Sequence, residues 1–99
     1  MRDEQHRFLS LSGYLPARLN AEQVGWLLNC HVNDVAILTS SRILNPLGSP
    51  APNSVKYFAT TEILELSKDR IWLAKFTNAI GQHWKSKNRK VIDRHQADL

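Results

Sequence analysis

Little in this 99-residue sequence points to a disulfide, a membrane span or a secretion signal. Its single cysteine, Cys30, cannot form an internal disulfide, which favours a reducing setting. No apolar run approaches the roughly 18 residues that a membrane-spanning helix needs. The charged segment 1–7 is not followed by the apolar core of a signal peptide. We therefore expect a cytoplasmic protein with no membrane partner.

Motifs for catalysis and for metal or cofactor binding are also missing. The sequence has no glycine-rich phosphate loop, no nucleophile elbow and no paired carboxylates beside an activating group. Cys30 and His31 adjoin each other, but a zinc site needs further ligands at suitable spacing. The remaining histidines do not supply that spacing: His6, His83 and His95. We expect no enzymatic activity, no cofactor, no metal and no small-molecule substrate, with Cys30 as a small buried apolar residue.

The positive charge is concentrated near the C-terminus. The chain carries 13 basic and 9 acidic side chains, for a formal charge of +4. Residues 81–95 hold five of the basic side chains and one acidic one, so the rest of the chain is neutral. The basic run 85–90 either anchors the protein to nucleic acid or is a solvated helix end, where cations are favourable in any case.

Residues 19–44 predict two short helices joined by a tight turn. Asn20 and Gln23 are spaced as a capping box, with Leu19 and Val24 placed as a hydrophobic staple. Asn29 stands where a left-handed residue ends a helix. Apolar residues recur at helical spacing on both sides of the turn: Val24, Leu27 and Leu28, then Val32, Val35 and Leu38. This order is the geometry of a helix-turn-helix.

The segments that follow predict a wing and two more helices. Three of the four prolines fall between positions 46 and 52, with branched and aromatic residues on either side. We interpret the flanks, 43–48 and 55–59, as two short antiparallel strands around a stiff tip; the alternative is a surface loop without strands. A short helix is expected to end at Leu66. A long amphipathic helix is expected to span about residues 69–86.

The predicted fold is mainly α, with a small β-hairpin wing. It consists of a helix-turn-helix, the wing, a short helix and a long C-terminal amphipathic helix. Residues 1–18 are expected to be a lead-in, disordered over 1–7, with Phe8, Leu9 and Leu11 as coil or a brief strand on the core. Residues 19–88 form a single domain, and residues 89–99 a flexible basic tail.

One family pattern runs through residues 19–66 in a register without gaps. The pattern opens with Leu-Thr, an acidic pair and two small residues, and it continues with Leu-Gly-Val-Ser ahead of the second helix. The matching positions here are Leu19-Asn20, Glu22-Gln23, Val24-Gly25 and Leu28-Asn29-Cys30-His31, followed by Val35, Leu38, Val55-Lys56-Tyr57-Phe58 and Glu62-Ile63-Leu64-Glu65-Leu66. This half of the chain resembles the winged helix-turn-helix of MerR-type transcription regulators and phage excisionase-like proteins.

The resemblance implies a small bacterial protein that binds double-stranded DNA, as a transcription regulator or an excisionase-like accessory factor. The second helix would enter the major groove, with Asn33, Ser40 and Ser41 near bases and Arg42 and Lys56 on phosphates. The full predicted DNA-binding set is Asn33, Ile37, Ser40, Ser41, Arg42, Lys56, Lys85, Lys87, Arg89 and Lys90.

Two residues on the outer face of the second helix depart from the family pattern. Asp34 would meet phosphate with like charge, and Ile37 would lie bare in the middle of the face. They favour a second hypothesis, a non-catalytic protein–protein interaction module with an apolar face around Ile37. We favour DNA binding, because the register is gap-free and the positive charge is clustered.

The long helix and two tryptophans have alternative roles. MerR-type proteins dimerise through a helix after the winged domain, so a homodimer through the long helix is one expectation. The other is that this helix folds back to complete the core. Trp26 either marks an interface or is covered by the long helix, and Trp84 is expected to contact the core or a partner.

Overall fold

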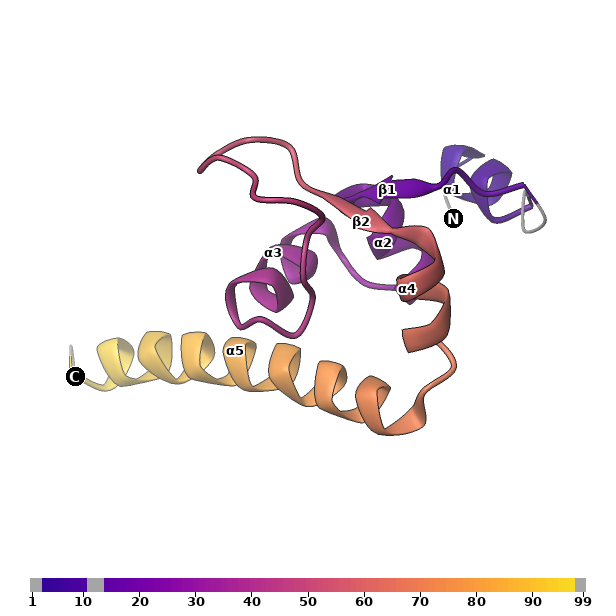
Figure 1. The fold of residues 1–99 in the computed structure, drawn as a ribbon. Helices are drawn as coiled ribbons and strands as arrows, with labels where there is room; N and C mark the ends of the chain where they lie inside the picture. Colours follow the sequence, from indigo (N-terminus) through magenta and orange to yellow (C-terminus); the bar gives the residue numbers. More distant parts are fainter. Residues whose placement is uncertain (1–2, 11–13, 98–99) are drawn as a thin grey trace.

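The computed structural model describes residues 3–10 and 14–97, with side chains described as far as Lys87. Five helices and two short strands are arranged as Figure 1 shows. In chain order they are α1 (Asp3–Leu9), β1 (Arg18–Asn20), α2 (Ala21–Leu28), α3 (Val32–Ser40), β2 (Tyr57–Ala59), α4 (Thr60–Leu66) and α5 (Arg70–Ala97). The predicted class is confirmed: the fold is mainly α, with one small antiparallel sheet and a long C-terminal helix.

The helix-turn-helix is built from reciprocal caps. Asn20 Oδ1 accepts from Gln23 N at 2.9 Å, and Gln23 Oε1 accepts from Asn20 N at 3.0 Å, which confirms the capping box of α2. Asn29 ends α2 in the left-handed region, at φ 58°. His31 then caps α3, since its Nδ1 accepts from Asn33 N at 3.1 Å. The first boundary of the turn is therefore set by the backbone of Asn29 and the second by the side chain of His31.

The core lies where α2, α3, the sheet and α4 meet. Most of the predicted stripes are confirmed, because Val24, Leu28, Val35 and Leu38 are buried and Leu27 is half-buried. Val32, expected on the inner face, is instead 41% exposed. The N-terminal half of α5 adds Phe76, whose ring stacks on Trp72 with centroids 5.3 Å apart. The buried apolar side chains are Phe8, Leu19, Val24, Leu28, Val35, Leu38, Leu44, Phe58, Ile63 and Phe76. This half of α5 thus completes the core, one of the two roles expected for it.

The sheet differs from the predicted wing in its strand pairing. The expected return strand is present as β2, but it pairs antiparallel with β1, with Leu19 opposite Phe58. Residues 41–56, all of them described, contain no strand, and Leu47 N–H donates to Tyr57 O at 2.8 Å across the base of this loop. Prolines within the loop lack the N–H that a ladder needs, which favours a loop over a second strand.

Both ends of the chain are more helical than predicted. Residues 3–9 form α1, where disorder was expected up to residue 7 and coil or a brief strand at Phe8 and Leu9. Asp3 and Glu4 in the first turn complement the helix dipole. Phe8 of α1 lies against Trp26, with ring centroids 5.3 Å apart, so α1 and not α5 covers Trp26. The expectation for Leu11 falls outside the described residues.

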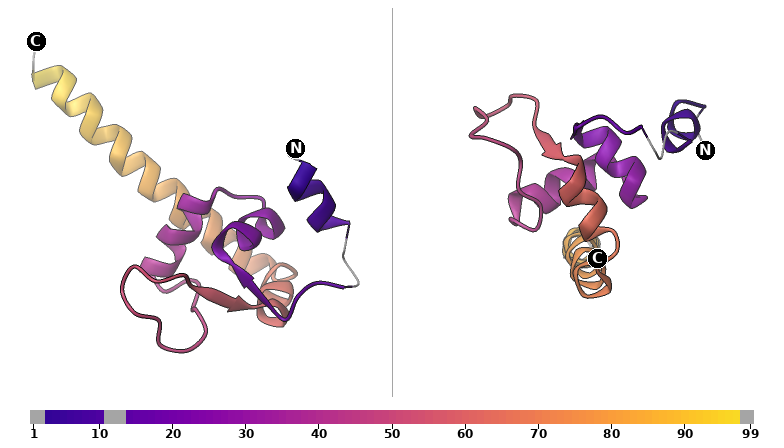
Figure 2. Two further views of the ribbon diagram at one scale, coloured as in Figure 1. Left: turned by 90° about the horizontal axis from the view of Figure 1, so that it is seen from above. Right: turned by 45° about the vertical axis from the view of Figure 1, so that its right-hand side comes forward.

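Helix α5 continues beyond the end predicted near residue 86. Asp69 begins it as expected, because its Oδ1 accepts from Ile71 N at 3.0 Å and from Trp72 N at 3.2 Å. The helix then runs to Ala97, through most of the segment predicted as a flexible tail. Residues 82–97 contain neither glycine nor proline to stop it. Figure 2 shows the C-terminal part of α5 projecting away from the other elements.

None of the helices in the described part of the chain combines the length and the apolar character that crossing a membrane requires.

Candidate nucleic-acid interface

Helix α3 presents an exposed edge on the side opposite its buried stripe. Val35 and Leu38 point into the core, whereas Asn33, Ala36 and Ser40 are exposed. At about 100° per residue, these three side chains share one narrow face of the helix. The edge is small and polar, with one methyl group between an amide and a hydroxyl.

One flank of α3 is covered by α5, which passes beneath it in Figure 1. Trp72 Nε1 donates to Ile43 O at 3.4 Å just past the C-terminal end of α3, and Trp84 Nε1 donates to Asp34 Oδ1 at 3.1 Å near its N-terminal end. The two hydrogen bonds therefore hold α5 near both ends of α3. Ile37 lies on this flank and is half-buried, in a shallow hollow that His83 also lines.

This packing corrects the expectation that Ile37 is bare in the middle of the outer face. The side of α3 that carries Asp34 and Ile37 is turned toward α5. The hollow of Ile37 and His83 is also lined by Ala36, Ser40 and Ser41, so it borders the exposed edge. The Ser41 hydroxyl donates to Ile37 O at 2.8 Å. The sequence could not reveal this, because it gives the angle of each residue around α3 but not the position of α5.

The other flank of α3 is a groove of about 730 Å³ between α3, the start of α2 and the loop before β2. Asn33, Ser40 and Lys56 all line it, so the structure brings together three predicted site residues from two segments. Val55, 68% exposed, and Val32, 41% exposed, give the groove an apolar part. Ala36 and Val55 were not predicted as site residues; neither side chain carries a charge or a donor that marks it in a sequence.

The remaining predicted cations lie around α3 rather than on it. Arg42 is exposed just after α3, with a left-handed backbone at φ 62°. Lys85 and Lys87 are exposed on α5 directly after Trp84, near the opposite end of α3. Arg89 and Lys90 belong to the helical part of α5, and their side chains lie outside the described ones.

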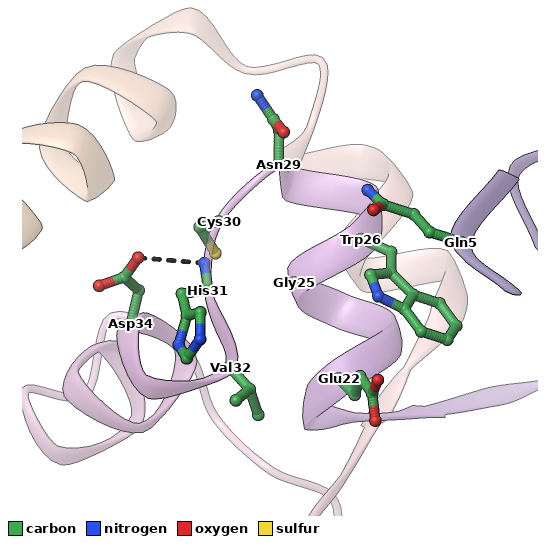
Figure 3. A pocket seen from close by; sticks show the side chains of 9 residues that line it. All are labelled: Gln5, Glu22, Gly25, Trp26, Asn29, Cys30, His31, Val32 and Asp34. Carbon is green, nitrogen blue, oxygen red and sulfur yellow. Dashed lines mark hydrogen bonds between the residues drawn. The ribbon is translucent and has the colours of Figure 1, made fainter. Parts of the chain in front are cut away.

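A second cavity, of about 650 Å³, lies between α1, α2 and the start of α3 (Figure 3). It contains Cys30 and His31, with the carboxylates of Glu22 and Asp34. Burial, and then the nearby Asp34 carboxylate, raise the pKa of the Cys30 thiol to about 11. The thiol is therefore protonated at neutral pH and is a poor nucleophile and metal ligand. The described residues contain no group of three potential ligands placed to hold a metal ion.

Comparisons of the chain with protein-family models, curated proteins and solved structures found no match.

Proposed function

We propose that this protein binds duplex DNA, as a transcription regulator or accessory factor, with the exposed edge of α3 in the major groove. One observation carries the proposal. The two side chains least suited to DNA are only partly exposed, because Asp34 accepts from Trp84 of α5 and Ile37 is half-buried in a hollow that His83 of α5 also lines. The edge that remains consists of Asn33, Ala36 and Ser40.

These three side chains suit base edges. The amide of Asn33 pairs with the N6 and N7 atoms of adenine, the hydroxyl of Ser40 serves as donor or acceptor, and the methyl group of Ala36 matches that of thymine. The backbone N–H of Asn33 already donates to His31 Nδ1, whereas its side chain is exposed and free to contact a base. A helix fits the width of the major groove.

The cations around α3 suit phosphates. Lys56 lies across the groove from Asn33, Arg42 follows the C-terminal end of α3, and Lys85 and Lys87 follow Trp84 near the N-terminal end. Contacts of this kind supply most of the non-specific affinity for DNA. A cytoplasmic location belongs to the same proposal, and it suits a chain with a single free cysteine.

The interaction-module hypothesis receives less support at Ile37. A protein-binding centre needs an apolar side chain that a partner can bury, and Ile37 is already half-buried on the flank that faces α5. The exposed apolar side chains beside α3 belong instead to the groove, at Val32 and Val55.

The test is fluorescence anisotropy with a pool of random duplex DNA at about 50 and 200 mM salt, a range in which several phosphate contacts change the affinity strongly. We expect binding that weakens at the higher salt, and a salt slope that falls by about 0.9 in Lys56→Ala. After a preferred DNA sequence has been selected, Asn33→Ala should lose about 1–3 kcal/mol of the binding free energy that discriminates between bases at one base pair.

Asn78→Ala is the matched control, because Asn78 is exposed on α5 away from the groove. The proposal is refuted by an absence of binding at both salt concentrations, or by equal effects of Asn33→Ala and Asn78→Ala on the selected site. Binding of a protein partner that Val55→Asp abolishes would support the interaction module instead.

A further inference from the structure

The carboxylate of Asp34 joins two elements that are far apart in the sequence. Its Oδ2 accepts from His31 N at 3.1 Å, which closes the capping box of α3. Its Oδ1 accepts from Trp84 Nε1 at 3.1 Å, which links the same turn to α5. One side chain therefore serves both as a cap of α3 and as an anchor for the long helix.

The hydrogen bond between Trp84 and Asp34 serves to orient α5 more than to bury apolar surface. Trp84 is 39% exposed, so its ring adds little to the core that Phe76 and Trp72 already complete. Trp72 Nε1, which donates to Ile43 O at 3.4 Å, makes the corresponding hydrogen bond at the start of α5. A hydrogen bond to an ionised carboxylate is directional and stronger than a neutral one. The hydrogen bond from Trp72 thus holds the start of α5, and the one from Trp84 fixes where α5 lies near the N-terminal end of α3.

The angle of α5 sets where its lysines lie. The ammonium of Lys87 is 5.2 Å from the centroid of the Trp84 ring, so it lies on the same face of α5 as the indole. Lys85 follows Trp84 directly, and His83 before it lines the hollow beside Ile37. The position of Trp84 against Asp34 therefore decides the distance between these lysines and the N-terminal end of α3.

We propose that Asp34 and Trp84 are positioning residues, which hold α5 along α3 so that Lys85 and Lys87 continue the DNA interface past the N-terminal end of α3. This inference rests on the proposed function and names the phosphates of duplex DNA as the ligand of the lysines. Asp34 then has a role at an interface where a carboxylate would otherwise only repel, because its two oxygens are engaged by His31 and Trp84.

The hydrogen bond between Asp34 and Trp84 is tested first in the free, full-length protein. The indole N–H resonances of the three tryptophans are recorded by ¹H–¹⁵N NMR and assigned by single Trp→Phe variants. In Asp34→Ala, we expect the Trp84 resonance to move toward that of a solvated indole, and the other two to stay in place. A Trp84 resonance that does not move in a folded Asp34→Ala protein would overturn the proposal.

The positioning role is then measured as the salt slope of DNA binding. Lys85→Ala with Lys87→Ala should lower the slope by up to about 1.8, at about 0.9 for each phosphate that is no longer neutralised. Trp84→Phe, which removes the indole donor and keeps an aromatic ring, should lower it by a similar amount although it removes no charge. Adding Trp84→Phe to the lysine variant should have little further effect, because the lysines it positions are gone.

Trp72→Phe is the matched control, since it removes the other indole donor of α5, which lies 12 residues before Trp84 and donates near the opposite end of α3. An equal fall in slope in Trp72→Phe would indicate general loosening and overturn the positioning role. If the wild type binds DNA, an unchanged or tighter DNA affinity in Trp84→Phe would also overturn the positioning role. If the wild type binds no DNA, the proposed function fails with this inference, whereas binding with a slope that Trp84→Phe leaves unchanged overturns this inference alone.

Discussion

Replacing Gly25 with alanine is expected to destabilise the protein, although alanine favours helices. Gly25 is a buried residue of α2 at the point where that helix approaches the turn. A Cβ built on it would lie 2.7 Å from Cys30 O, with the carbonyl carbons of Cys30 and His31 at 3.7 Å. The crowded atoms belong to the backbone, and Cys30 N–H donates to Gly25 O at 2.9 Å, so the turn cannot simply rotate away.

The magnitude follows from two opposing effects. Adding a methyl group to a packed site typically costs about 1–3 kcal/mol. Alanine is favoured over glycine inside a helix by roughly 1 kcal/mol. A clash against backbone places the first effect near its upper end, so we expect a net loss of about 1–2 kcal/mol. In a domain of this size, that corresponds to a fall in Tm of roughly 4–16 °C.

The assay is urea unfolding followed by circular dichroism, with Gly81→Ala as the matched control. Gly81 lies within α5, and a Cβ there meets no atom within 4 Å. The same substitution should therefore stabilise the protein by about 0.5–1 kcal/mol at this position. The reasoning is refuted if Gly25→Ala proves as stable as the wild type, or if both variants shift stability in the same direction.

Three further predictions concern the N-terminal cap of α2 and the cysteine of the turn. Asn20→Ala removes the side-chain oxygen that accepts from Gln23 N. It should lower the free energy of unfolding by about 1 kcal/mol in the same urea assay. An unchanged free energy of unfolding would contradict the capping role. Burial raises the pKa of the Cys30 thiol from 9.0 to about 11. At pH 9, iodoacetamide should therefore react with Cys30 more than about tenfold slower than with a free thiol. A reaction rate that is already half-maximal at pH 9 would contradict this. Because the unfolded thiol releases its proton first, this group should also make stability fall as pH rises from about 9 toward 11, a slope that Cys30→Ala should flatten.

The helix-turn-helix could be predicted because its signals are local. The capping box joins Asn20 to Gln23, three residues apart, and Asn29 adopts the left-handed conformation that its side chain tolerates better than most. Val35 and Leu38 lie on one face through helical spacing alone. Each of these features depends on neighbours within about one turn of helix, which a sequence displays directly.

The strand pairing could not be predicted from local signals. Residues 55–59 were expected to pair with the nearest branched segment, 43–48, across a proline-rich tip. The partner of Phe58 is instead Leu19, which the sequence presents as part of a helix entry. Leu19 is fully buried in this pairing and also precedes the cap of α2, so one residue serves two elements. Periodicity identifies a strand but does not identify which distant segment completes it.

The candidate site also has a part that local signals predict and a part that depends on distant segments. Asn33, Ser40 and Lys56 were predicted together and do line one groove, since Asn33 and Ser40 share a helix face and Lys56 ends the loop that faces it. The surroundings of Asp34 and Ile37 depend on α5, whose Trp84 is 50 residues from Asp34 in the sequence. Without that helix, both side chains could only be placed on an open face.

The two apparent departures from a DNA-reading helix have a common physical explanation once α5 is in place. A flank that packs against another helix needs an apolar side chain to bury and a polar one to fix the crossing, and Ile37 and Asp34 supply these. An arginine or lysine at either position would place a charge against α5, where Trp84 offers a donor rather than an acceptor. On the DNA-binding proposal, the basic groups that this flank of α3 lacks are carried by α5 itself, at Lys85 and Lys87.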